Sequence, residues 1–242
     1  MVTIEGKNPV IEALEGQRKI KKIYLQQNIH GEKIKYIKKL VQLDGIMLKR
    51  VSKQELDKIV GDRNHQGVVA IGQKNQLYDI EVILQRAQKQ REAPLLVILD
   101  EIQDPHNMGA IIRTACAAGA HGLIFARNRQ VGITSTVIKV AAGATEHLPL
   151  VRVANINYAL KKIKQAGVWV VGAEIENATV YYEKKFKGPL ALVIGNEGRG
   201  LRRLVKKNCD FLVKIPMKKM NSLNASVATG ILLFEIIRQR QN

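Results

Sequence analysis

The feature that most constrains the fold is a series of continuous apolar runs beyond Pro94. Six strand-sized runs alternate there with segments of helical periodicity, and they occupy residues 95–99, 122–125, 148–153, 168–171, 190–194 and 211–215. The runs lack the regular alternation of apolar and polar residues that a strand with one solvated face shows. Strands of this kind need helices on both faces, so the pattern predicts an open parallel α/β sheet.

Residues 1–76 predict a second, smaller α/β domain, because short strand and helix patterns alternate there too. Ser52 and Glu55 form the Ser-x-x-Glu pattern of a helix capping box. Residues 77–93 are polar and rich in Gln, which predicts a linker that contains a short helix. The expected domains are therefore 1–76 and 94–242, joined by the linker 77–93.

The charge of the chain points to a polyanionic partner. Its 39 Lys and Arg against 21 Asp and Glu give a formal net charge of +18. Residues 1–76 contribute 15 basic and 8 acidic side chains, so the excess is shared between both halves. Basic surface gains affinity for nucleic acid by releasing the counterions condensed on phosphates. A solvated basic surface without a partner is the alternative, and no Lys-rich helix has the aromatic face that would favour a membrane.

The remaining composition predicts a cytoplasmic protein without metal or membrane span. The N-terminus has no continuous apolar core of the kind found in secretory signals, and the apolar runs are too short to cross a bilayer. The two cysteines are expected to be buried, reduced thiols, and the histidines lack metal-ligand spacing. These residues are Cys116, Cys209, His30, His65, His106, His121 and His147.

Three turn-rich motifs follow strands of the predicted sheet. The first is Asp-Pro-His-Asn-Met-Gly at 104–109, the second is Gly-Asn-Glu-Gly-Arg-Gly at 195–200, and the third spans 215–226. Ligands of open parallel sheets bind beyond the carboxyl ends of the strands, so the three loops predict one site. The second motif is neither the dinucleotide fingerprint nor a Walker loop. Any one of the loops alone would be more simply explained as structural.

Together and in this order, the motifs resemble those of the SpoU (TrmH-like) RNA ribose 2′-O-methyltransferases, a branch of the SPOUT superfamily. The resemblance implies a SPOUT sheet with a deep trefoil knot, S-adenosylmethionine as cofactor, RNA as substrate, and a homodimer with the active site near the subunit interface. Residues 1–76, with the sequences at 6–10 and 65–68, are similar to the L30e-like substrate-binding domain of part of the family. That pairing resembles the branch that methylates a guanosine of bacterial 23S rRNA.

The resemblance also implies roles for individual residues. The cofactor would be held by Gly195, Asn196, Gly200, Ile215, Met217 and Leu223, and the catalytic group would consist of Asn107, Arg113, Glu197, Ser222 and Asn224. Only four residues separate Met217 from Ser222, which is one short of the usual spacing, and the glycine common there is missing.

Arg113 is the residue for which chemistry and resemblance must be reconciled. A guanidinium is essentially never deprotonated, which argues against a literal general base and favours a clamp on the substrate phosphate that also stabilises the developing alkoxide. Proton acceptance then falls to phosphate, water or Glu197. We expect Glu197 to be the charge partner of Arg113, and a purely structural Arg–Glu pair is the alternative.

Simpler interpretations remain for the third motif and for the function. Ser222 could be only the N-cap of the last helix, in which Leu223, Val227, Ile231 and Phe234 have the spacing of core residues. Besides methylation of large-subunit rRNA, the sequence allows a tRNA ribose 2′-O-methyltransferase or a non-catalytic RNA-binding factor of ribosome assembly.

Overall fold

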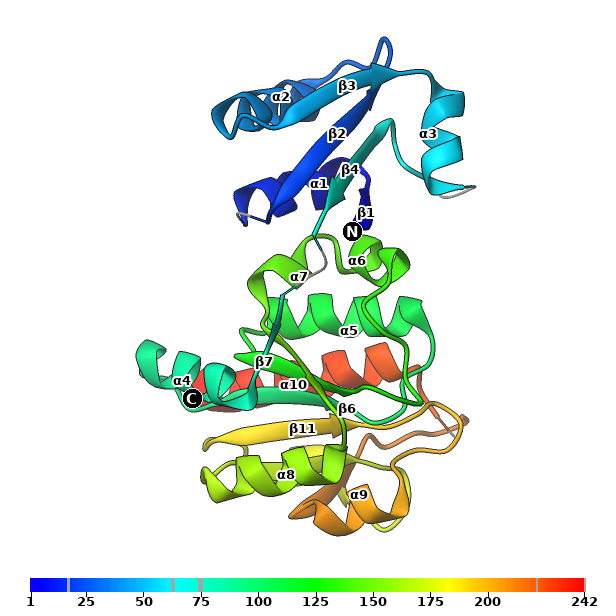
Figure 1. The fold of residues 1–242 in the computed structure, drawn as a ribbon. Helices are drawn as coiled ribbons and strands as arrows, with labels where there is room; N and C mark the ends of the chain where they lie inside the picture. The colour runs from blue at the N-terminus through cyan, green and yellow to red at the C-terminus, as the bar shows by residue number, and fades with distance from the viewer. Residues whose placement is uncertain (17, 62–63, 74–75, 221, 242) are drawn as a thin grey trace. The chain divides into compact units, whose positions relative to one another are not determined.

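The computed structural model describes residues 1–16, 18–61, 64–73, 76–220 and 222–241 (Figure 1). Its contacts divide the chain into two compact units. The smaller unit combines residues 1–75 with 133–147, and the larger unit combines 76–132 with 148–242.

The smaller unit is built on a four-stranded sheet of order β1-β4-β2-β3. Its strands are β1 (Val2–Glu5), β2 (Ile20–Gln26), β3 (Met47–Val51) and β4 (Val68–Gly72), and only the β2–β3 pairing is parallel. Three helices connect the strands, namely α1 (Lys7–Glu15), α2 (Glu32–Leu43) and α3 (Lys53–Val60). The predicted capping box is present at the start of α3, where Ser52 and Glu55 cap each other reciprocally.

A segment from the second half of the sequence completes the smaller unit. Residues 133–147 form α6 (Ser135–Ala141) and α7 (Ala144–His147), and Ile138 of α6 joins the core that contains Ile4 and Ile23. Arg18 binds Glu146 at 2.9 Å between guanidinium and carboxylate. The domain boundaries expected from the sequence did not separate this segment, because an amphipathic pattern shows that a face is buried but not against which partner.

The larger unit confirms the expected open parallel sheet. Eight strands run in the order β10-β12-β9-β11-β6-β7-β8-β5, and every pairing between them is parallel. The three central strands, β6 (Leu95–Leu99), β7 (Gly122–Ala126) and β11 (Leu190–Ile194), are buried along their whole length. The others are β5 (Leu77–Tyr78), β8 (Leu150–Val153), β9 (Trp169–Ala173), β10 (Thr179–Val180) and β12 (Phe211–Lys214).

Helices cover both faces of this sheet, as the apolar central strands require. In Figure 1, α5 (Pro105–Ala117) and α10 (Ala225–Gln241) lie on one side of β6 and β11, and α8 (Ile156–Gln165) and α9 (Arg203–Asn208) lie on the other. A short 3₁₀ helix, η1, spans Tyr181–Glu183. The strand order reverses where β11 and β7 flank β6, and such a switch point is where doubly wound sheets bind ligands.

The segment expected as a linker is integrated into the larger unit. β5 pairs with β8 at the sheet edge, and α4 (Ile80–Gln90) buries Ile80, Ile83 and Ala87, of which Ile80 and Ile83 belong to the same core as α8. The Gln residues that made this segment polar lie on the exposed face of α4. Three apolar positions at helical spacing are therefore sufficient to dock the helix.

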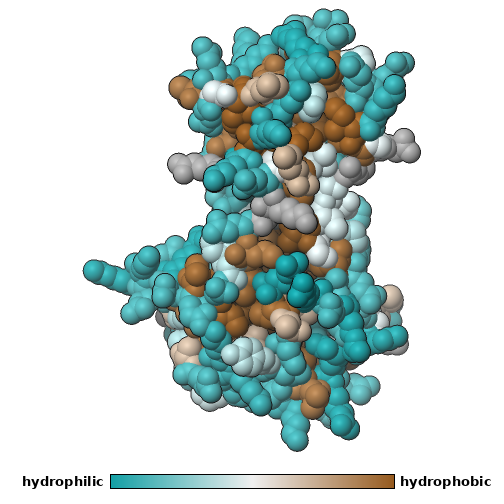
Figure 2. Space-filling model, viewed as in Figure 1, coloured by the Kyte–Doolittle hydropathy of each residue, from teal (hydrophilic) through white to brown (hydrophobic). Residues whose placement is uncertain are grey.

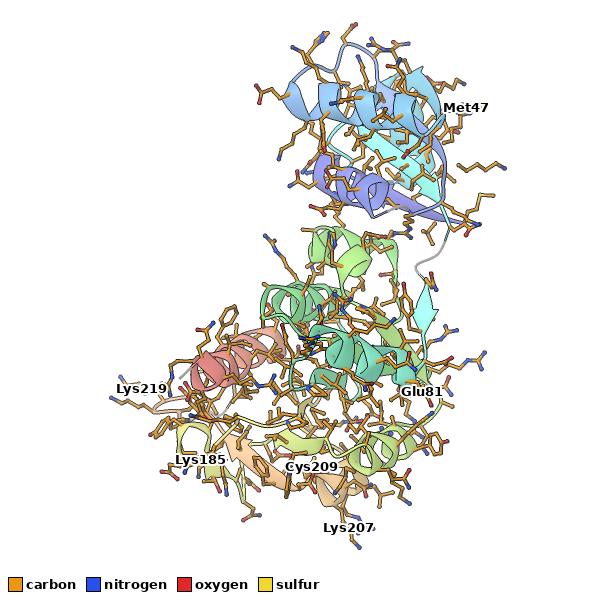
Figure 3. The ribbon with its side chains drawn as sticks, turned by 90° about the vertical axis from the view of Figure 1, so that its left-hand side faces the viewer. Met47, Glu81, Lys185, Lys207, Cys209 and Lys219 are labelled. Atoms are coloured by element: carbon orange, nitrogen blue, oxygen red, sulfur yellow. The ribbon has the colours of Figure 1, made fainter. Side chains whose placement is uncertain are left out.

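Both cysteines are half-buried and reduced. Cys209 lies inside the larger unit, whereas the side chain of Lys207 points away from it (Figure 3). Burial is the main cause that raises the pKa of Cys209 to about 12, so its thiol is unreactive near neutral pH. Figure 2 shows hydrophilic residues over much of the visible face of each unit. In the described ranges no helix is both long and apolar enough to cross a membrane.

Candidate active site

The loop after β11 is closed on itself by backbone hydrogen bonds. Asn196 and Gly200 form an isolated antiparallel bridge, with N–O distances of 3.1 and 2.8 Å in the two directions. A Cβ atom on Gly195 would lie 2.4 Å from the carbonyl carbon of Gly200 and 2.6 Å from the amide nitrogen of Leu201. Only glycine permits so close an approach of two backbone segments, so the 195–200 motif has a steric reason to begin with Gly195.

A buried carboxylate ties this loop to the end of β6. Asp100 is fully buried, and its two oxygens accept hydrogen bonds from the Arg202 backbone amide at 2.9 Å and from Arg202 Nε at 2.7 Å. The side-chain amide of Asn196 donates to the carbonyl oxygen of Glu101 at 3.0 Å. The carboxyl ends of two neighbouring strands are therefore joined by charge-assisted bonds. Sequence reasoning missed Asp100 and Arg202, although Asp100 directly follows an apolar run.

The loop forms one wall of a pocket at the carboxyl edge of the sheet. The pocket encloses about 600 Å³, open space at its mouth included, and is lined partly by backbone and apolar groups of β11, β12 and α10. All six residues that the resemblance assigned to the cofactor line it, namely Gly195, Asn196, Gly200, Ile215, Met217 and Leu223. Apolar walls with a few polar groups are typical of small-molecule sites.

Glu174 is a lining residue that the sequence interpretation did not identify. It follows β9, its side chain is 7 % exposed, and its carboxylate binds Lys206 Nζ and accepts a hydrogen bond from the Ile175 amide at 3.0 Å. The rule that ligands bind beyond strand ends could have found it, because β9 belongs to the same sheet edge. With Glu197, it places two acidic groups in the pocket wall.

Three of the predicted catalytic residues form a continuous hydrogen-bonded relay. Asn107 Nδ2 donates to Glu197 Oε1, and Asn107 Oδ1 accepts from Asn224 Nδ2 at 2.8 Å. Asn224 Oδ1 in turn accepts from the backbone amide of Ser226 at 2.9 Å. Asn107 is 7 % exposed, and the partners on both sides fix which way its amide points. The first, second and third motifs thus meet at this relay.

The structure corrects the interpretation of the last helix. Helix α10 begins at Ala225, and its N-cap is Asn224, whereas exposed Ser222 precedes the helix. Asn221, next to it, lies outside the described residues. Val227 and Phe234, expected in the core, are 49 % and 53 % exposed. They lie seven residues apart and therefore on one face of α10.

Arg113 is not brought to the relay by its own chain. It is exposed on α5, and no hydrogen bond or ion pair joins its guanidinium to any residue that the structure describes. The expected partnership with Glu197 is replaced by the Asn107–Glu197 bond. Arg113 lies six residues after Asn107, which corresponds to a rotation of roughly 600° about the helix axis. The two side chains therefore point to different sides of the helix.

The described residues contain no group of three or more His, Cys, Asp or Glu placed to hold a metal ion.

Fold and site together define a doubly wound α/β protein with a pocket at the carboxyl ends of β9, β11 and β12. Residues 94–234 match the model of the SpoU rRNA methylase family, and residues 3–78 match that of the RNA 2′-O ribose methyltransferase substrate-binding domain. The chain belongs to the SpoU rRNA methylase family.

Similar proteins match this chain over almost its full length. YacO of Bacillus subtilis, named for the TrmH family of tRNA/rRNA methyltransferases, is 43 % identical over 97 % of this chain and 94 % of its own. The SpoU methyltransferase AviRb of Streptomyces viridochromogenes, solved in complex with the cofactor AdoMet, superposes with a TM-score of 0.83 at 26 % identity, covering 99 % and 90 % of the two chains. An AdoMet-bound rRNA methyltransferase of Sinorhizobium meliloti gives 0.81 at 29 %, covering 98 % and 87 %.

Proposed function

We propose that this protein transfers a methyl group from S-adenosylmethionine to the 2′-hydroxyl of a guanosine ribose in 23S-type large-subunit rRNA. The observation that carries the proposal is the Glu197–Asn107–Asn224 relay beside the pocket that all six expected cofactor residues line. Membership of the SpoU family supports the reaction class, and the rRNA methyltransferase of Sinorhizobium meliloti supports the choice of RNA.

The residues of the pocket fit S-adenosylmethionine. Gly195 and Gly200 present no side chain to the pocket and so leave room for a flat ligand, and Ile215, Leu223 and Leu232 offer apolar surface. The acidic group of Glu197 suits a ligand that carries positive charge, whereas the charge of Glu174 is paired with Lys206. When bound, this cofactor supplies an electrophilic methyl group on a cationic sulfonium. AviRb, a family member of similar structure, was solved with it.

The relay positions the substrate side of the reaction. Since Asn224 fixes the amide of Asn107, and Asn107 donates to Glu197, the carboxylate is held where it can accept a hydrogen bond from a ribose hydroxyl. Arg113 clamps the neighbouring phosphate and stabilises the developing alkoxide through its charge and fork geometry. No bond to a metal or to the protein chain is needed for a direct displacement of this kind.

Arg113 reaches the relay from a second copy of the chain in this proposal. Its guanidinium has no partner among the described residues, and α10, which packs against α5, exposes Val227 and Phe234 on one face. An apolar stripe on a helix that lines the site is suited to a two-fold interface. The homodimer expected from the sequence would then complete each site with a residue from its partner.

Mixing two inactive variants tests this arrangement. Arg113→Ala and Glu197→Ala are purified separately, mixed, dissociated and reassociated, and methyl transfer is measured. If the site is shared, half of the dimers are mixed and each mixed dimer has one intact site, so about a quarter of the wild-type rate returns. If both residues serve the same subunit's site, mixing restores nothing. Phe234→Glu, which places charge in the stripe, should give a monomer by light scattering.

The smaller unit is proposed to hold the RNA. Its match to the substrate-binding family and the basic excess of residues 1–76 support this division of labour. In the larger unit, the side chain of Lys219 points outward from the segment between β12 and α10 (Figure 3), where it can approach phosphate. The L30e-like character of the smaller unit, the trefoil knot and the cytoplasmic location stay predictions.

Substrate choice separates the rival functions. The protein is incubated with labelled S-adenosylmethionine and either undermodified large-subunit rRNA or unmodified tRNA, and the methylated nucleotide is mapped. We expect transfer to rRNA. Transfer to tRNA alone would favour the tRNA enzyme, which the combined tRNA/rRNA name of the Bacillus relative leaves open. Tight RNA binding without any transfer would identify an assembly factor.

A further inference from the structure

A second pocket lies wholly within the smaller unit, and no role described above uses it. It is lined by Gln26, Lys53, Asp57, Asn64, His65, Gln66 and Gly67, and it encloses about 890 Å³, open space at its mouth included. Three of these residues belong to the 65–68 sequence that links the unit to the substrate-binding domain. We call it the turn pocket.

The wall of the turn pocket is a rigid turn. The Val68 amide donates to the His65 carbonyl oxygen at 2.9 Å, and φ is +51° at Gln66 and +76° at Gly67. Positive φ at both central residues is the signature of a type I′ turn. Glycine is favoured at position 67 because of this positive φ; a Cβ there would also lie 2.4 Å from Ile29 Cδ1, the end of a side chain that would have to shift.

His65 holds this turn and hydrogen-bonds Asp57, the acid among the described residues that line the pocket. Its ring is 5 % exposed; Nδ1 accepts from the Gly67 amide at 2.9 Å, and Nε2 lies 3.0 Å from Asp57 Oδ1. The tautomer with its proton on Nε2 satisfies both bonds. One oxygen of Asp57 is thereby hydrogen-bonded within the protein.

Several polar groups of the turn pocket remain available to a ligand. Asn64 Oδ1 accepts from the Gln66 amide at 3.2 Å, and Gln66 Oε1 accepts from the Lys7 amide at 3.4 Å, which orients both side chains. In the described part of the chain no residue accepts from the side-chain NH₂ groups of Asn64 and Gln66. The side-chain amide of Gln26 and the Lys53 ammonium likewise have no partner there. The pocket thus offers amide donors, an amide acceptor and one cation on a fixed frame.

We infer that the turn pocket binds one unpaired nucleotide of the RNA substrate. Gln26, Asn64 and Gln66 would hydrogen-bond the edge of the base, and Lys53 would contact its phosphate. Unstacked bases in loops and bulges expose the edges that proteins read in RNA, and side-chain amides can both donate to and accept from them. This inference rests on the proposed function, since it identifies the part of the same RNA that the smaller unit grips.

Binding of the full-length protein to a fluorescent transcript of undermodified large-subunit rRNA tests the inference. The pocket variants are Gln26→Ala and Lys53→Ala. Their matched controls are Gln54→Ala and Lys58→Ala, which remove the same side chains from exposed positions of α3 outside the pocket. We expect each pocket variant to raise Kd about tenfold and each control to change it less than about twofold.

Salt dependence distinguishes the two kinds of contact. Lys53→Ala should reduce the slope of log K against log salt by about one, whereas Gln26→Ala should leave the slope unchanged. The affinity for S-adenosylmethionine should match the wild type in all four variants, which shows that the larger unit is unchanged.

Pocket variants that bind the transcript as tightly as the wild type would overturn the inference. So would controls that lose as much affinity, because the effect would then be general charge or helix loss. If the protein transfers methyl groups but the pocket variants bind RNA as tightly as the wild type, the role of the turn pocket is refuted and the proposed function stands. If RNA binding depends on the turn pocket but no methyl group is transferred, the proposed function is refuted and the role of the pocket stands.

Discussion

Replacing Gly195 with Ala adds one methyl group and should disable the cofactor pocket. The new Cβ would lie 2.4 Å from the Gly200 carbonyl carbon and 2.5 Å from its oxygen. Ordinary carbon contacts need about 3.5 Å, so the two backbone segments must separate by roughly 1 Å. The atoms that the new Cβ would meet belong to the backbone and not to a flexible side chain. A rotamer change therefore cannot relieve the strain.

The magnitude follows from what the separation breaks. The bridge between Asn196 and Gly200 consists of two backbone hydrogen bonds of 3.1 and 2.8 Å. At about 1 kcal/mol net for each bond, the loss is about 2 kcal/mol, which corresponds to a roughly 30-fold weaker affinity if it falls on the bound state. If the whole loss falls on stability instead, the melting temperature should drop by about 4–8 °C.

Calorimetry with S-adenosylmethionine measures this effect, and the same loop supplies its control. A Cβ on Gly198 would meet nothing closer than Asn196 Oδ1 at 3.7 Å, and Gly198 has no positive φ, so Gly198→Ala should bind within about twofold of the wild type. Wild-type affinity in Gly195→Ala, or an equal loss in Gly198→Ala, would refute the assignment of the pocket to the cofactor.

Three further predictions address the relay, the clamp and pH. Arg113→Lys should lower kcat at least about tenfold at unchanged cofactor affinity, and a near-normal rate would contradict the need for a planar fork. Asn107→Asp should set a carboxylate against Glu197 and cost about 2 kcal/mol of unfolding free energy near neutral pH, measured in denaturant, with recovery in acid if repulsion is the cause. Burial lowers the pKa of His121 below its usual 6.5; Glu92 opposes this shift, and Arg240 and Arg86 add to it. Because the unfolded chain then binds more protons, stability should fall as pH drops below about 6.5, and His121→Asn should flatten the curve.

The sequence predicted the larger sheet and the place of its site because both follow from simple burial. Strands such as 95–99 and 190–194 are apolar throughout, which only a sheet covered on both faces explains. Once the strands are parallel, the loops after them meet at one edge, so Asn107, Gly195 and Asn224 could be brought together from their positions alone.

Partner choice is what the sequence could not decide. The spacing of Val227 and Phe234 marks an apolar face, and it is equally compatible with a core and with an exposed stripe. Ser222 and Asn224 are both good N-caps, and only the contact of Asn224 with Asn107 selects the second. We expected Arg113 to pair with Glu197 because their charges are opposite. The position of Arg113 on α5, however, decides which residues its side chain can contact. The excursion at 133–147 joined the smaller unit for a similar reason.

The position of the transferred methyl group tests the central claim most directly. RNA labelled by the protein from S-adenosylmethionine is hydrolysed completely in alkali, which requires a free 2′-hydroxyl beside each phosphodiester bond that it breaks. Ribose 2′-O-methylation predicts that the label is recovered in alkali-stable dinucleotides and that Arg113→Ala removes it. Label recovered in mononucleotides would show methylation of a base and would contradict the account.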